Sequence, residues 1–128
     1  YILSIPGIGL IGCATILAET GGLGNYRHVK QVISLAGLNL CESSSGLYQG
    51  KRHISHRGRK SLRQILYMLG MKQASKGMPL HLKYKSFVDR GVPKPKAIVA
   101  ISINLLRIAF ALVHNKSTFS PERYPVAQ

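Results

Sequence analysis

Apolar residues recur at three- and four-residue intervals along most of the chain, which is the spacing of an amphipathic helix. Glycine and proline interrupt this pattern and mark where helices end. The sequence therefore predicts an all-α fold. A short helix ends near Ser4, and the helices after it span residues 10–20, 28–36, 60–76, 78–90 and 96–114.

The last of these helices contains the longest apolar run, Ala97–Val113. Ser102, Asn104 and Arg107 interrupt the run, and 17 residues are short for a membrane span. The pattern therefore favours the core helix of a small domain over a membrane segment.

Neither helical nor strand periodicity continues through residues 38–59, which are rich in serine, glycine and positive charge. We name these residues the serine-basic segment and predict a long surface loop, with room for one short strand pair. Such loops are usually functional when they occur in a compact domain. The expected organisation is one domain, residues 1–116, with a hairpin at 1–20, the serine-basic segment, a helical remainder at 60–115, and a flexible tail at 117–128.

The hairpin Ile5-Pro6-Gly7-Ile8-Gly9 matches a helix-hairpin-helix pattern. In that motif glycines let the backbone approach a phosphate, which the free amides of the next helix then bind. Gly7, Ile8 and Gly9 are therefore candidate DNA-backbone contacts. An ordinary helix–helix connection would give the same residues.

The charge of the chain is strongly unbalanced, with 18 Lys and Arg against 4 Asp and Glu and a formal net charge of +14. A compact domain with this excess usually has a polyanionic partner, and nucleic acid fits better than an anionic membrane. The carboxylates lie far apart in sequence, and the two cysteines and five histidines have no metal-ligand spacing. We predict no metal site within this chain, no membrane, and a reducing, cytoplasmic setting.

The serine-basic segment and the start of the following helix allow two interpretations. Their cations either contact phosphates only, or they surround a serine that attacks a DNA phosphodiester. Histidines in the segment serve equally well as phosphate contacts or as general bases. The candidate nucleic-acid-binding residues are Lys51, Arg52, His53, His56, Arg57, Arg59, Lys60 and Arg63.

Five motifs occur in a characteristic order: Ile5–Gly9, Gly37-Leu38, Ser44-Ser45-Gly46, His53–Gly58 and Leu62-Arg63. In this order they resemble the C-terminal domain of the insertion-sequence 110 transposases, a group that includes related site-specific invertases. The resemblance extends over residues 2–115. Leu40, where relatives often carry proline, and Arg59, which replaces a frequent asparagine, depart from the pattern without removing a catalytic group.

The resemblance implies a DNA recombinase whose serine, the one directly before glycine, becomes covalently linked to DNA. That serine is Ser45, with Ser44 as the alternative. It also implies a divalent metal, magnesium, held by an Asp-Glu-Asp-Asp set in an N-terminal domain that this chain lacks. Some members use a guide RNA encoded by the element and assemble as multimers. We therefore expect the full-length protein to be a homo-oligomer associated with the bacterial nucleoid. We therefore expect this chain to bind DNA and, by itself, not to recombine it.

Two alternatives to the transposase hypothesis stay open at this point. One is a non-catalytic helix-hairpin-helix module that binds only the duplex backbone. The other is a structural RNA-binding protein, which the charge alone fits equally well.

Overall fold

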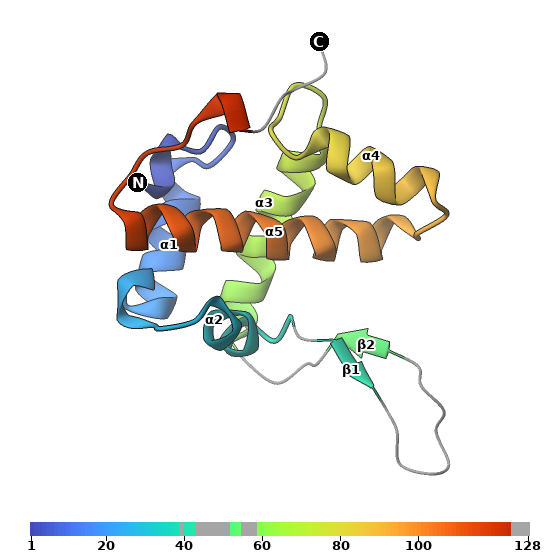
Figure 1. Ribbon diagram of the computed structural model, residues 1–128. Coiled ribbons are helices and arrows are strands. Elements are labelled where there is room, and N and C mark those ends of the chain that lie inside the picture. The colour runs from blue at the N-terminus through green and yellow to red at the C-terminus, as the bar shows by residue number, and fades with distance from the viewer. Residues whose placement is uncertain (39, 43–51, 55–58, 124–128) are drawn as a thin grey trace.

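The computed structural model describes residues 1–38, 40–42, 52–54 and 59–123 (Figure 1). This part of the chain is helical apart from one short antiparallel strand pair, so the predicted helical class is confirmed for it. The α-helices are α1 Leu10–Thr20, α2 Val29–Ala36, α3 Lys60–Ala74, α4 His81–Asp89 and α5 Lys94–Asn115. The strands are β1 Leu40–Glu42 and β2 Arg52–Ile54, and the 3-10 turns are η1 Ile2–Ser4, η2 Leu23–Asn25 and η3 Pro121–Arg123.

Helix α5 crosses α1 and α3, which lie beside each other behind it in Figure 1. Its length and composition would also allow it to cross a membrane. Ile101, Leu105 and Leu106 are nevertheless buried in the common core, as expected for the core helix that the sequence predicts. The packing is close: a Cβ on Gly70 of α3 would lie 2.1 Å from the Ser102 Oγ of α5.

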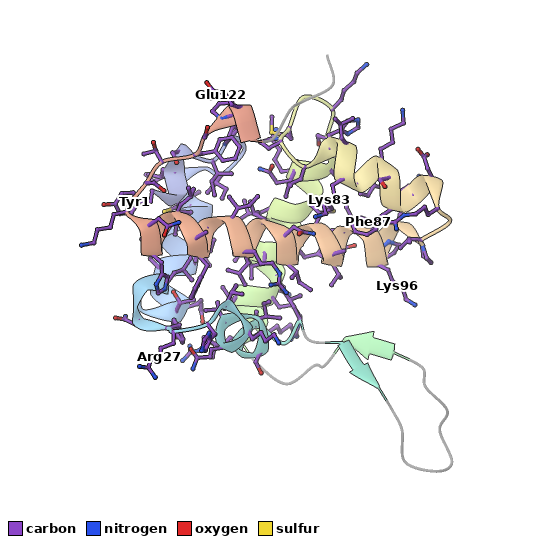
Figure 2. The ribbon with its side chains drawn as sticks, viewed as in Figure 1. Tyr1, Arg27, Lys83, Phe87, Lys96 and Glu122 are labelled. Atoms are coloured by element: carbon purple, nitrogen blue, oxygen red, sulfur yellow. The ribbon has the colours of Figure 1, made fainter. Side chains whose placement is uncertain are left out.

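Helix α4 packs beside the N-terminal half of α5 (Figure 1). Tyr84 and Phe87 pack against the core, and the Lys83 Nζ donates a hydrogen bond to the Asn104 Oδ1 of α5 at 3.2 Å. Figure 2 shows Lys83 and Phe87 in the space between the two helices, whereas Lys96 points into solvent from the first turn of α5. The polar bond and the apolar contacts together fix α4 along α5.

The ends of the serine-basic segment are held at one place. After α2, Gly37 adopts a left-handed conformation (φ 71°), and the Leu38 amide donates to the Ile33 carbonyl at 3.1 Å, which ends the helix. Where the chain returns, the Arg59 amide donates to the Leu35 carbonyl at 2.7 Å. The C-terminus of α2 and the N-terminus of α3 therefore meet at the root of this segment.

Within that segment the described residues form the strand pair that the sequence leaves room for. The register pairs Leu40 with Ile54, Cys41 with His53 and Glu42 with Arg52. The prediction of a long loop beyond the pair falls on residues outside the described part of the chain.

Several helix boundaries differ from the sequence prediction; helix α3, for instance, ends at Ala74 and not at residue 76. The first helix is only the 3-10 turn η1. Helix α4 begins at His81, not Met78, because successive three-residue turns occupy positions 75–81. Helix α5 begins at Lys94 and includes Pro95, which the first turn of a helix tolerates because no intrahelical acceptor is needed there.

The first residues of the predicted tail pack against the N-terminus. The Phe119 amide donates to the Ser4 Oγ at 2.7 Å, and the Phe119 ring contacts the core. The turn η3 follows, and residues 124–128 lie outside the described part.

Candidate nucleic-acid interface

The predicted site residues fall into three groups in the structure. Ser44, Ser45, Lys51, His56 and Arg57 lie outside the described residues. For Arg52 and His53 the structure gives the backbone of β2 and its register. The hairpin residues Gly7, Ile8 and Gly9, and the α3 residues Arg59, Lys60 and Arg63, are fully described.

The N-terminus of α3 carries Arg59, Lys60 and Arg63, the fully described cations that the sequence prediction singled out. Arg59 is its N-cap and offers no side-chain capping bond, and no acidic residue lies in the first turn. The amides of Lys60, Ser61 and Leu62 precede the first intrahelical bond, which joins the Arg63 amide to the Arg59 carbonyl at 3.0 Å. Free amides, the helix dipole and adjacent cations all favour an anion here.

Arg63 extends this arrangement into the protein. Its Nη1 is buried and has no hydrogen-bond acceptor in the part of the chain that the structure describes. A buried donor without a partner costs about 1–3 kcal/mol, and more when it is charged. A phosphate oxygen at this nitrogen would remove that cost, provided that the atoms covering the nitrogen move aside when the anion binds.

The Arg59 side chain already has an ion-pair partner in the protein. Its Nη1 lies 3.1 Å from the Glu19 Oε2 on α1, with 56% and 24% of the two side chains exposed. A pair this exposed is worth about 0–1 kcal/mol in water. It fixes the direction of Arg59 and leaves Lys60 and Arg63 without a carboxylate partner among the described residues.

The hairpin Ile5–Gly9 serves mainly to pack against α3. Gly7 has φ +90°, and a Cβ there would lie 2.9 Å from the Gln73 Nε2. That same Gln73 nitrogen donates to the Pro6 carbonyl, and the Ile8 side chain is buried. Gly7 and Ile8 are therefore occupied by the core, and only Gly9 has open space beside it.

The free amides that follow Gly9 stand among apolar side chains. Leu10 and Ile11 are 73% and 80% exposed, and α1 carries no Lys or Arg. A helix of 11 residues is about 16 Å long, and Glu19, the partner of Arg59, lies near its far end. The hairpin and the α3 terminus are thus two separate places, and the helix-hairpin-helix function stays a prediction.

A groove between α2 and α5 was not predicted from the sequence. Its volume is about 600 Å³, and its lining includes two cations, Lys30 and Arg107, from helices far apart in sequence. The only signal in the sequence was Arg107 itself, a charge inside an otherwise apolar helix. In the described residues no group of three or more His, Cys, Asp and Glu is placed to hold a metal ion.

Residues 1–85, from η1 through most of α4, match the family described as Transposase IS116/IS110/IS902 family. This chain belongs to that transposase family. The family match includes the hairpin, the serine-basic segment and the α3 terminus, which are the places where the sequence motifs lie.

Two relatives of this transposase-family chain extend the similarity to nearly its whole length. The insertion element IS116 uncharacterized 44.8 kDa protein of Streptomyces clavuligerus is 27% identical over 127 residues, which cover 99% of this chain and 32% of the relative. The pilin gene-inverting protein of Moraxella bovis is 29% identical over 120 residues, 92% of this chain and 37% of the relative. The pilin gene-inverting protein of Moraxella lacunata matches to the same extent. The chain spans about a third of the length of these relatives.

Proposed function

We propose that this chain is the DNA-binding, serine-bearing C-terminal domain of a transposase or site-specific recombinase. Family membership supports the class of protein. The observation that carries the DNA-binding part is the α3 terminus, where free amides and Lys60 surround the buried, unpartnered Arg63 Nη1. Because transposases act on DNA, we propose that the anion bound at this helix end is a DNA phosphate.

The position of this terminus supports a role beside the reacting phosphate. Leu38 and Arg59 fix both ends of the serine-basic segment next to α3. The segment therefore begins and ends beside the helix end that is proposed to bind a phosphate, which supports a role for its serine at that phosphate. Ser45 is the proposed nucleophile, and Ser44 is the alternative.

The proposed step exchanges one phosphoester bond for another. The serine Oγ attacks the phosphorus, and the bond to one deoxyribose oxygen breaks. The proton of the serine hydroxyl ends on that departing oxygen, carried by a general base for which His53 and His56 are the candidates. Lys60, Arg63 and the free amides stabilise the charge on the phosphate oxygens as the bonds exchange.

The magnesium implied by the family resemblance does not fit the described residues, because they contain no suitable group of ligands. We propose that a domain outside this chain holds it. No step of the chemistry proposed for this chain passes through the metal.

The full-length protein is proposed to work in the cytoplasm, at the nucleoid, as a homo-oligomer. The exposed apolar side chains of α1, Leu10, Ile11 and Leu17, support association with another protein surface. An element-encoded guide RNA is a further proposed partner, and the net charge of +14 supports a second polyanion.

The decisive experiment is Ser45→Ala in the full-length protein, with Ser44→Ala and Ser61→Ala as matched variants. Ser45→Ala should abolish the covalent protein–DNA product seen on a denaturing gel, while DNA affinity stays within about twofold because one hydroxyl adds little to the phosphate electrostatics. Ser61→Ala should keep both. Normal recombination by Ser45→Ala would refute the nucleophile assignment, and loss with Ser44→Ala alone would move it by one residue.

A further inference from the structure

The groove between α2 and α5 combines an apolar base with a cationic rim. Ile33 and Leu38 are buried and Ile103 is half-buried, whereas Lys30 and Arg107 are exposed. On α5, Ile103 and Arg107 are one turn apart and share a face. On α2, Lys30 and Ile33 do the same, so each helix contributes both an apolar and a charged side chain.

Neither cation of the groove has a partner among the residues that the structure describes. In the described residues no hydrogen bond or ion pair involves the side chain of Lys30 or Arg107, and no carboxylate lines the groove. Exposed cations on opposite helices, with no acid between them, create a positive potential across the opening. The groove is therefore complementary to an anion that also has an apolar surface.

The walls of the groove are fixed before any ligand arrives. The Gln31 Oε1 accepts hydrogen bonds from the Arg27 and His28 amides at 2.9 and 3.2 Å, which caps the start of α2. Leu38 ends α2 through its bond to the Ile33 carbonyl. A volume of about 600 Å³ lies within the usual range of about 300–1,000 Å³ for small-ligand sites.

We infer that this groove binds one unpaired nucleotide of single-stranded DNA. Its phosphate lies between Lys30 and Arg107, and its base lies on Ile33, Leu38 and Ile103. A duplex cannot occupy the site in this way because its bases are paired and stacked, whereas an unpaired base has two apolar faces to bury. The inference rests on the proposed function, since strand exchange by a recombinase exposes unpaired DNA.

Leu38 connects this groove to the rest of the candidate interface. It lines the groove and is the last described residue before β1, at the root of the serine-basic segment. A strand held in the groove would therefore leave it close to that root. In this arrangement the groove holds unpaired DNA while the α3 terminus holds a phosphate of the reacting strand.

The first test compares binding to labelled DNA by fluorescence anisotropy at one salt concentration. Lys30→Gln/Arg107→Gln should weaken binding of a single-stranded oligonucleotide about tenfold, through the loss of two phosphate contacts. Its effect on a duplex of the same sequence should be no larger than that of the control Lys85→Gln/Lys96→Gln, which removes the same charge from exposed positions outside the groove lining. Equal losses in the two double variants on single strands would overturn the inference.

The second test examines the base. A pentanucleotide lacking its central base should bind the unchanged protein about 5- to 100-fold more weakly than the intact strand, the range expected for one buried base. Ile103→Ala should reduce that difference, with helicity checked by circular dichroism. If the two pentanucleotides bind equally, the groove does not hold a base.

Two controls separate this inference from the proposed function. A matching RNA strand that binds the groove more tightly than DNA would overturn the assignment to DNA. Duplex binding that depends on Arg63, together with single-strand binding that does not depend on Lys30 and Arg107, would leave the proposed function standing and refute the groove as a nucleotide site. No binding to any nucleic acid would refute both.

Discussion

The Arg63→Met substitution tests whether Arg63 serves to bind DNA or only to stabilise the fold. The buried Arg63 Nη1 has no acceptor among the described residues, at a cost of about 1–3 kcal/mol to the folded state. Methionine keeps an unbranched apolar stem and removes the unpaired donor. We therefore expect the free energy of unfolding to rise by about 1 kcal/mol, or by a few °C in Tm.

The same substitution should weaken DNA binding. The loss of one phosphate contact lowers the slope of log K against log salt by about 0.9. Thermal unfolding without DNA and anisotropy titrations at several salt concentrations measure the two effects. An increase in stability together with a loss of affinity is the expected result, since the unpaired nitrogen is useful only when an anion is bound.

Arg59→Met is the matched control on the same helix end. It breaks the bond to Glu19 and should lower stability by up to about 1 kcal/mol. The reasoning would be refuted if Arg63→Met lowered stability and left the salt slope unchanged, because Arg63 would then be a packing residue.

Three further substitutions test the packing and the surface. Gly70→Ala should destabilise the protein by about 1–3 kcal/mol in urea unfolding, because its Cβ would lie 2.1 Å from the Ser102 Oγ; an unchanged midpoint would contradict the close α3–α5 packing. Gly7→Ala should cost at least about 1–2 kcal/mol, since φ is +90° there, and DNA affinity of the folded protein should not change if the hairpin serves packing. Ile11→Glu, at a position 80% exposed, should leave Tm within about 1 °C and reduce self-association in sedimentation velocity, whereas unchanged association would exclude this face as the contact.

Local signals in the sequence were sufficient to place most of the helices. Helix α1 runs over the predicted residues because Gly9 and Gly21 bound it, and Gly21 takes the left-handed conformation that ends it (φ 74°). Helix α4 was placed too early because tertiary packing decides its start. Leu80 is buried, and as the N-cap it ends a series of turns that a local pattern does not reveal.

The candidate site was only partly predictable for a similar reason. The cations at the α3 terminus are consecutive or one turn apart, so composition and helix polarity were enough to select Lys60 and Arg63. The unpartnered state of the Arg63 nitrogen depends on what surrounds it in space, which the sequence does not give. The groove is the extreme case, because Lys30 and Arg107 are 77 positions apart and meet only through the packing of α2 on α5.

The anchoring at α2 and α3 connects stability to function. The Arg59 amide bonds the end of α2, and its side chain bonds Glu19 of α1, so three helices fix the residue at which the serine-basic segment joins α3. The cationic helix end is therefore tied to two other helices even though its own charges repel one another. A phosphate that binds Lys60 and Arg63 relieves this repulsion and also satisfies the buried Nη1, so the same contact should stabilise the fold and position the DNA.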